Sequence, residues 1–505
     1  MNSIKTTKMS NFRWVICALL FLATTVNYMD RQVLSLTWKD FISPEFHWTD
    51  DDYGTITAIF SIFYAIANLF AGKFIDWMGT KKGYLIAIFV WSLGAVLHAF
   101  SGIMACGVLT GNWLVGFDTA KELIAGYIEN GTVSPGVENC ISLFGNVVPT
   151  AMLAVSTISV YFFLAFRLIL AVGEAVNFPA AIKVTAEFFP KKDRAFSTSI
   201  FNSGASVGAL AAPATIPLLA RACGWELAFI IIGVLGFVWM GLWIALYEHP
   251  HKSKYVNRAE LNYIYQDEHV ACEEKVEEEE KTISFLKCFT FRQTWSFIVG
   301  KLFTDGVWWF FLFWAPAYFS DQYGYTSDSA MGVMLIFTLY AIVTVLSIGG
   351  GYLPTYFVDK KGMNPYIGRM RAMFIFACFP VLGLLAQPLG QYSAWWPAII
   401  IGLLGAGHQA WSANLYSTIG DMFPKSTIAT ITGIGTMAGG LGSFAINKGA
   451  GAFFTWAGCQ GSTFHFMGFD GKPAAYMIVF SICSVAYLLG WFIMKALVPK
   501  YKPVM

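Results

Sequence analysis

The sequence holds 505 residues, of which 56% are hydrophobic and 13% are charged. Because soluble domains carry roughly 25% charged residues, this chain has too few polar side chains to cover the soluble domains that its length alone suggests. The net charge of +2 comes without any basic stripe, which excludes a protein that binds nucleic acid. The nine cysteines show no CxxC or metal-ligand spacing, which excludes a zinc site. Together with a mean hydropathy of +0.57, the composition predicts an all-α protein that crosses a membrane several times.

Twelve segments are apolar and long enough to span a bilayer as helices. They cover residues 13–36, 53–75, 83–104, 155–182, 196–219, 226–247, 295–319, 329–357, 369–388, 393–419, 427–450 and 474–496. The first lacks a small-residue cleavage site, so we expect a retained helix rather than a signal peptide. A charged stretch divides the segments six and six. We therefore predict an N-terminal bundle over 1–247, a cytoplasmic central loop over 248–294 and a C-terminal bundle over 295–505.

The lysines and arginines of the short loops predict the orientation. Most of them fall on the side that holds both termini and the central loop, whereas the opposite side has only Lys39, Lys121, Arg221, Lys448 and Lys472. Since cytoplasmic loops carry the excess of basic residues, we expect both termini in the cytoplasm and the protein in the inner (cytoplasmic) cell membrane.

An internal repeat supports two pseudo-symmetric halves. The run Glu187-Phe-Phe-Pro-Lys191 recurs as Asp421-Met-Phe-Pro-Lys425, and repeats of this kind are typical of transporter folds. The first half has an additional segment at about 105–154, between its third and fourth helices. We expect this insert to form a small external cap or hairpin. Cys106 and Cys140 within it are candidates for a disulfide in an oxidising compartment, with two free thiols as the alternative.

Charged and titratable residues inside the spans are the candidate functional residues, because a charge at the bilayer centre costs ~2.5–3.5 kcal/mol. They are Asp30, Arg31, Arg167, Glu174, Lys301, Asp305 and His408. Arg167 and Glu174 lie seven residues apart and share one helical face. Lys301 and Asp305 lie four apart and can touch.

These charges balance, with three acids and three bases. Entry of one anion would leave one charge unmatched unless a carboxylate took up a proton, which couples the anion to the proton. The proton would also cancel the ~2.3 kcal/mol that one charge costs against 100 mV. Static ion pairs that hold helices together are the alternative, and for Lys301–Asp305 the two interpretations are equally open.

Aromatic and amide side chains accompany the charges. The candidates for contact with a ligand are Tyr28, Tyr64, Asn202, Trp308, Trp309, His408, Gln409, Trp411 and Asn414. Rings stack on the C–H faces of a polyhydroxylated ligand and amides bind its hydroxyls, although packing and interface anchoring also explain single aromatics. The motifs HExxH and GxxxxGK[ST] do not occur, and the one GxSxG match, Gly204-Ala-Ser-Val-Gly208, lies inside an apolar span rather than at a strand-to-helix turn. We therefore expect neither an enzyme nor a cofactor.

Several motifs resemble those of the major facilitator superfamily. The run from Gly72 to Lys82, with Asp76, Gly79 and Lys81, resembles the signature loop between its second and third helices, which gates the transport path. More narrowly, the chain resembles the anion:cation symporter branch, and most of all its hexuronate members. The motifs that carry this resemblance are Asn27-Tyr-Met-Asp-Arg31, Gly173-Glu174, Phe201-Asn-Ser-Gly204, Trp308-Trp309, Trp314-Ala-Pro316 and Gly407-His-Gln-Ala410.

The resemblance implies two bundles of six helices that rock about a central site. It implies that Arg31 holds the substrate carboxylate and that Tyr28 and Tyr64 line the pocket. The implied proton-coupling residues are Asp30, Arg167 and Glu174.

One departure bears on the substrate. Relatives that carry galactonate have a glutamine in the fifth helix where this chain has Ala205, which leaves recognition of hydroxyls to Asn202, Gln409 or Asn414. We therefore expect a monomeric protein in the lipid bilayer that imports galacturonate or glucuronate, with H⁺ as the coupling ion. Another organic anion such as an aldonate, another coupling ion, and a membrane sensor or scaffold that transports nothing are the alternatives.

Overall fold

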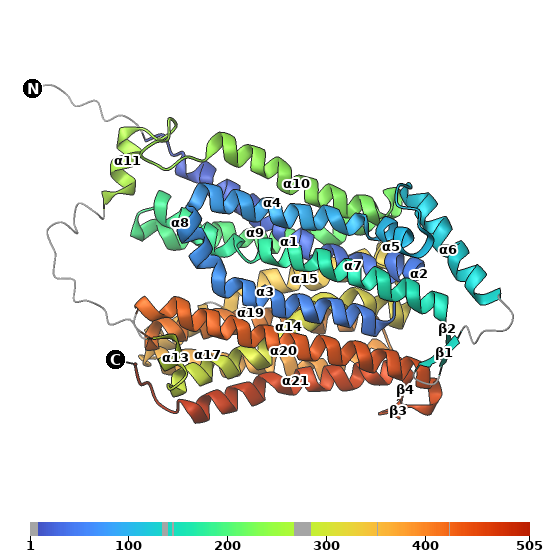
Figure 1. The fold of residues 1–505 in the computed structure, drawn as a ribbon. Coiled ribbons are helices and arrows are strands. Elements are labelled where there is room, and N and C mark those ends of the chain that lie inside the picture. The colour runs from blue at the N-terminus through green and yellow to red at the C-terminus, as the bar shows by residue number, and fades with distance from the viewer. Residues whose placement is uncertain are drawn as a thin grey trace, which may run out of the picture.

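The computed structural model describes the backbone of residues 9–133, 140–143, 146–266, 284–350, 352–423 and 425–504. Long helices dominate both halves of these residues (Figure 1). Those of the first half are α1 (Arg13–Thr37), α3 (Asp50–Met78), α4 (Thr80–Ala99), α7 (Thr150–Glu174), α9 (Lys191–Cys223) and α10 (Trp225–Leu246). Those of the second half are α14 (Arg292–Tyr323), α15 (Ala330–Gly350), α17 (Pro365–Cys378), α19 (Trp395–Met422), α20 (Lys425–Gln460) and α21 (Gly471–Leu497).

One of these helices accounts for all or most of each predicted span. The third span is completed by α5 (Ser101–Thr110), and the ninth by the 3₁₀-helix η3 (Pro380–Leu385) and α18 (Ala386–Gly390). The eighth was expected to run to residue 357, but α15 ends at Gly350, and α16 (Tyr352–Thr355) and η2 (Tyr356–Lys360) form its last described residues. The fourth span was expected to run to residue 182, but α7 ends at Glu174 and α8 (Asn177–Phe188) begins after a short turn. Pro179 favours a new helix start here, because proline has no N–H to continue the helical ladder and fits best in a first turn.

Short elements fill the connections. Near the first helix are the π-helix η1 (Trp38–Ile42) and α2 (Ser43–Phe46). The central segment contributes α11 (Arg258–Ile264) and α13 (Phe285–Cys288), and the second half adds α16 (Tyr352–Thr355), η2 (Tyr356–Lys360) and η4 (Gly461–Thr463). Two antiparallel hairpins pair β1 (Cys140–Leu143) with β2 (Asn146–Pro149), and β3 (His465–Phe466) with β4 (Phe469–Asp470).

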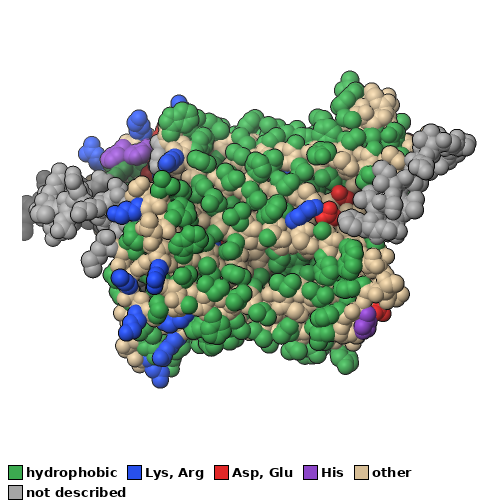
Figure 2. Space-filling view, turned by 60° about the horizontal axis from the view of Figure 1, so that its bottom comes forward, with side chains coloured by type: hydrophobic (Ala, Val, Ile, Leu, Met, Phe, Trp, Pro, Cys, Tyr) green, Lys and Arg blue, Asp and Glu red, His purple; other side chains and the backbone are tan. Residues whose placement is uncertain are grey.

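Nine helical segments of the described residues are long and apolar enough to cross a membrane. Helices α1, α19 and α20 are also long but lie outside this set. Polar residues in α1 and α19, and glycines in α20, lower their hydropathy. Hydrophobic side chains cover the middle of the visible face in Figure 2, as expected of a surface that meets lipid.

The two halves lie side by side with their helices roughly parallel (Figure 1). In the first half α1 packs on α9, and α4 packs on α7 and α10; in the second half α14 packs on α20 and α21, and α15 on α19. Helices α3 and α20 join the halves. Glycines permit this close approach: a Cβ at Gly54 would lie 2.7 Å from the Asn447 carbonyl oxygen, and one at Gly440 would lie 2.4 Å from the Ala65 Cβ.

The described part of the chain begins and ends at the same end of the bundles, which we call the proximal end. The other end, which carries the hairpins, is the distal end (Figure 1). The insert lies at the distal end as α6 (Phe117–Val133) and the β1–β2 hairpin. Lys121 of α6 contacts Glu226 at 2.7 Å and Glu45 at 3.6 Å, which ties the insert to the first half. Cys106 is a buried free thiol, and the side chain of Cys140 lies outside the described residues.

At the proximal end, Glu260 of α11 fastens the central segment to the start of α1. Its carboxylate accepts hydrogen bonds from the backbone N–H of Phe12 (3.0 Å) and of Arg13 (3.1 Å), and from the Arg13 guanidinium (3.1 Å). It also accepts one from the hydroxyl of Ser10. The carboxylate is fully buried. One side chain therefore satisfies several donors at a helix start, where no helical partners exist.

We predict that Glu260→Ala lowers the free energy of unfolding by ~1–3 kcal/mol, because it leaves buried donors unsatisfied. Thermal unfolding of the purified protein in detergent measures the change. Glu248→Ala is the matched control, since the Glu248 carboxylate is 53% exposed and lies 3.9 Å from Lys81. Equal melting temperatures for the two variants would contradict the anchoring role.

Candidate functional site

Arg31 of α1 forms a buried ion pair with Glu174 at the end of α7. The two guanidinium atoms Nη2 and Nε lie 2.9 Å and 3.2 Å from the same carboxylate oxygen, Oε2. The side chains are only 6% and 0% exposed. Sequence analysis assigned both residues to the site, but not to each other. The structure adds their direct pairing across two helices.

Three aromatic rings surround the Arg31 guanidinium. Its Cζ lies 4.6 Å from the ring centre of Tyr64, 5.3 Å from that of Tyr28 and 5.4 Å from that of Trp309. Cation–π attraction stabilises a guanidinium at these distances. Tyr28 and Tyr64 belong to the first half, whereas Trp309 comes from α14 of the second. The Arg31 cage therefore spans both halves, where relative motion of the halves would change it.

Asp30 and Arg167 complete the charged group of the first half. Arg167 donates from Nη2 to the backbone carbonyl of Arg31 (3.1 Å) and lies over the Phe60 ring (4.6 Å). Electrostatic interactions join it to Asp30 and Glu174. Neither carboxylate oxygen of Asp30 has a hydrogen-bond partner among the described residues, nor does Glu174 Oε1. Buried charges that lack hydrogen-bond partners lower the stability of the fold. A purely structural role therefore does not explain these carboxylates.

The second half contains its own ion pair, between Lys301 and Asp305 of α14. The Lys301 ammonium lies 2.5 Å from the Asp305 carboxylate and donates to the Tyr416 hydroxyl at 3.0 Å. Gly439 of α20 provides the room, because a Cβ there would lie 2.4 Å from Asp305 Oδ2. Sequence analysis missed Tyr416. Its spacing of seven residues from Gln409 places both on one face of α19, and this is the signal that would have found it.

The polar group of α19 is directed largely into its own half. The His408 ring is stacked on Trp308, with centres 5.3 Å apart and planes at 5°, and its Nδ1 lies 2.8 Å from the Tyr487 hydroxyl. Trp411 is fully buried and packs on Tyr487. The Asn414 amide donates to the Ala410 carbonyl one turn earlier (2.8 Å). In this conformation these contacts occupy His408 Nδ1 and the Asn414 amide nitrogen, whereas Trp411 Nε1 is buried without a hydrogen-bond partner among the described residues. Tyr487, which connects them, was not predicted.

Two further predicted ligand contacts lie apart from the cage. Gln409 is half-buried on α19, and Asn202 is exposed on α9. Gly204 and Gly208 of α9 press against α1, since a Cβ at either would lie within 2.5 Å of a backbone oxygen of α1. The structure therefore places Asn202 near the tight α1–α9 contact, with no hydrogen bond to Arg31 among the described residues.

The predicted gating loop forms the tight turn between α3 and α4. Gly79 has a φ of +77°, a conformation that favours glycine. Gly72 is exposed on α3, and Lys81 and Lys82 follow at the start of α4, where Lys81 lies 3.9 Å from Glu248. The side chain of Asp76 lies outside the described residues.

Comparison with known proteins agrees with this architecture. The model of the Major Facilitator Superfamily matches residues 20–120 and 140–446. The chain is 26% identical over 447 residues to the hexuronate transporter of Escherichia coli (strain K12), covering 88% of each protein. It is 23% identical over 386 residues to the galacturonate transporter of Dickeya chrysanthemi, covering 75% of this chain and 94% of that one.

A solved structure shares the fold. The bacterial homolog of the human lysosomal transporter Spinster, in an inward-facing and occupied conformation, superposes with a TM-score of 0.63 at 16% identity and 97% coverage of both chains. The matching proteins are transporters, not enzymes. This chain belongs to the Major Facilitator Superfamily, as a multi-pass, all-α membrane transporter.

Proposed function

We propose that this protein imports a hexuronate, galacturonate or glucuronate, together with protons. The observation that carries the proposal is the Arg31–Glu174 ion pair inside a cage of rings from both halves. A uronate offers a carboxylate for Arg31 and a ring whose C–H faces fit against aromatic side chains. The hexuronate and galacturonate transporters among its relatives support the same class of substrate.

The coupling follows from charge balance at Arg31. The substrate carboxylate competes with Glu174 for the same guanidinium, so it binds best when Glu174 has taken a proton. Asp30, which lies in the same electrostatic group, is the second proton acceptor, and Arg167 moderates both. One proton per uronate keeps the buried group neutral, which avoids the ~2.3 kcal/mol cost of moving one charge against 100 mV.

The distribution of basic residues supports the direction of import. Lysines and arginines gather at the proximal end in Figure 2. By the positive-inside tendency, this end faces the cytoplasm and the distal end faces the outside of the inner membrane. The uronate would then enter at the distal end and leave at the proximal one.

Substitutions at Arg31 test the binding site. Arg31→Ala should abolish binding and uptake of uronate, because Arg31 is the cation that the described residues place against the rings of Tyr28, Tyr64 and Trp309. Arg31→Lys should weaken both at least tenfold, since a lysine keeps the charge but loses the planar guanidinium that stacks on rings and bonds a carboxylate twice. Uptake and binding of radiolabelled uronate in proteoliposomes measure the loss. Wild-type uptake by Arg31→Ala would contradict the assignment.

Glu174→Gln tests the coupling. This variant should still exchange labelled for unlabelled uronate across the membrane but lose accumulation driven by a pH gradient, because glutamine cannot carry the proton. Glu248→Gln, at an exposed carboxylate, is the control and should behave as wild type. Retention of pH-driven accumulation in Glu174→Gln would rule out the role of Glu174.

A competition panel tests the substrate. Unlabelled uronates, aldonates and dicarboxylates are each added to uptake assays, with and without an imposed pH gradient. We expect galacturonate or glucuronate to compete best and the gradient to raise uptake. Stronger competition by an aldonate would move the substrate to that class, and the absence of any uptake would favour a membrane sensor.

A further inference from the structure

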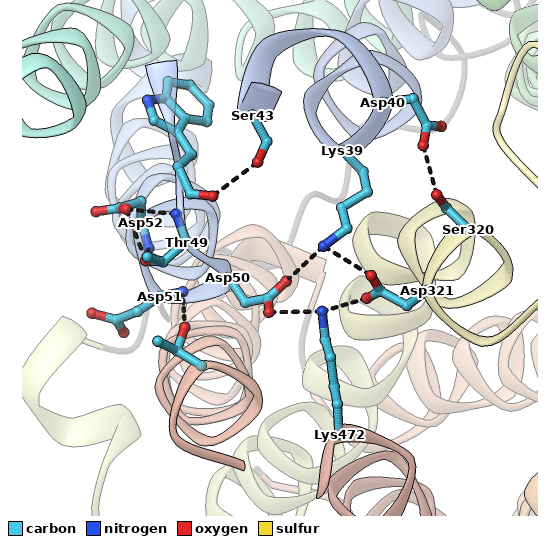
Figure 3. A network of polar contacts seen from close by, with 12 residues as sticks. Lys39, Asp40, Ser43, Thr49, Asp50, Asp51, Asp52, Ser320, Asp321 and Lys472 are labelled. Carbon is cyan, nitrogen blue, oxygen red and sulfur yellow. Dashed lines mark hydrogen bonds and ion pairs between the residues drawn. The ribbon is translucent and has the colours of Figure 1, made fainter. Parts of the chain in front are cut away.

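Four charged side chains form a ring across the two halves at the distal end (Figure 3). Lys39 of η1 and Asp50 of α3 belong to the first half, and Asp321 of α14 and Lys472 of α21 belong to the second. Each lysine contacts both aspartates, so charges of opposite sign alternate around the ring. Their side chains are between 10% and 25% exposed, which shields the ring from most water.

Two of the four contacts in the ring each join residues of a single half, and the other two cross between the halves. The pairs within a half are Lys39–Asp50, at 3.6 Å, and Lys472–Asp321. The crossing pairs are Lys39–Asp321, at 2.8 Å, and Lys472–Asp50, at 2.7 Å. The Tyr476 hydroxyl of α21 also donates to Asp321 (3.0 Å), which holds Asp321 to its own half. Separation of the two halves would therefore leave each half with one lysine and one aspartate of the ring.

A layer of buried aromatic side chains lies beside this ring of charges. Trp38, the neighbour of Lys39, is stacked on Tyr53 with centres 4.1 Å apart and planes at 5°. Trp314 of the second half packs edge-on against both, at 5.8 Å and 5.1 Å. The Tyr53 hydroxyl donates to the Phe313 carbonyl across the boundary (2.8 Å). All three rings are at most 1% exposed, so they exclude water from the boundary.

Further bonds close the same end. Lys448 of α20 contacts Asp51 of α3 at 2.6 Å, and Arg221 of α9 lies 3.8 Å from Asp328. Asp40 accepts hydrogen bonds from Ser320 and from the backbone N–H of Ser327, as Figure 3 shows in part. The four ion pairs that join described residues of one half to described residues of the other all lie at the distal end. The boundary is thus fastened electrostatically at one end.

We propose that Lys39, Asp50, Asp321 and Lys472, with the ring layer of Trp38, Tyr53 and Trp314, form the distal gate of the transport path, and that the gate opens by dividing into two neutral pairs. Within the ring, opening breaks only the two crossing contacts. Each lysine of the ring keeps an aspartate of its own half, so none of the four charges is left without a partner. The ring therefore needs no additional ion or proton to divide.

Charge swaps distinguish the pairs within one half from the pairs that cross between the halves. The double variant Lys39→Asp/Asp50→Lys keeps the pair within the first half but places like charges across both crossing contacts. Adding Asp321→Lys and Lys472→Asp restores opposite charges at all four contacts. Backbone hydrogen exchange of peptides from the distal ends of α3, α14 and α21 reports opening without any substrate, so the result does not depend on the identity of the transported anion.

The double variant should exchange faster in these peptides by on the order of tenfold, since a shift of this size needs only about 1.4 kcal/mol. The quadruple variant, with all four charges swapped, should exchange at the wild-type rate. His465→Asp/Asp470→His is the matched control, because it swaps a pair within the second half at the same end, and it should leave exchange at these peptides unchanged.

Neutralisation provides a second measurement if the double variant folds poorly. Lys39→Gln/Asp50→Asn removes the crossing attraction without repulsion and should accelerate exchange in the same peptides to a smaller extent. Wild-type exchange in this variant and in the double variant would overturn the proposal. A quadruple variant that exchanges as fast as the double variant would also overturn it, because pairing between the halves would then not control the opening.

Discussion

A charge inside a membrane protein must find its opposite within the protein, because lipid offers none. Arg31 satisfies this constraint with Glu174, and the rings of Tyr28, Tyr64 and Trp309 surround the pair. In this arrangement one side-chain carboxylate holds the arginine, and the carboxylate of a ligand can take its place. Replacement of a side-chain carboxylate by a ligand carboxylate is neutral only if the displaced group takes a proton. The proposed transport of a uronate with protons follows from this one constraint.

The same constraint recurs where the halves meet. Several buried or partly buried cations have a counter-charge in their own half: Arg31 with Glu174, Lys301 with Asp305, Lys39 with Asp50 and Lys472 with Asp321. Two bundles that each balance their own charges can separate and rejoin at low electrostatic cost. The glycines between α3 and α20 bring the backbones close without interlocked side chains, which would ease such a separation sterically.

Local patterns predicted most of the helices and the charged members of the site. Apolar runs of about 20 residues have one physical solution in lipid, a helix whose backbone bonds are internal, and every predicted span coincides with helix. The end of α7 was misjudged, because residues 175–182 are apolar enough to continue it and hydropathy does not register the effect of Pro179 on the ladder. Asp30, Arg31, Arg167 and Glu174 were found because charge in an apolar run is costly wherever the chain folds.

The partners of those residues could not be read in the same way. Tyr416 and Tyr487 look like ordinary interface aromatics in the sequence, and they acquire their roles from Lys301 and His408 on neighbouring helices. Trp411 was predicted to contact the ligand with the other polar residues of α19, yet its side chain is buried in the core. Which face of a helix meets the boundary depends on packing between helices, and that information is distributed over the whole chain.

By itself, the sequence determined that this is an all-α membrane protein and predicted twelve spans in two related halves, with balanced charges at depth, because transfer energies and helical periodicity act locally. Only the tertiary structure decided that Arg31 pairs with Glu174, that Trp309 completes its cage from the other half, and that Lys39, Asp50, Asp321 and Lys472 meet in one ring. Lys39 and Lys472 are separated by hundreds of residues, and neither lies in an apolar run where its charge would stand out. Their meeting depends on how two bundles dock, which no local pattern encodes.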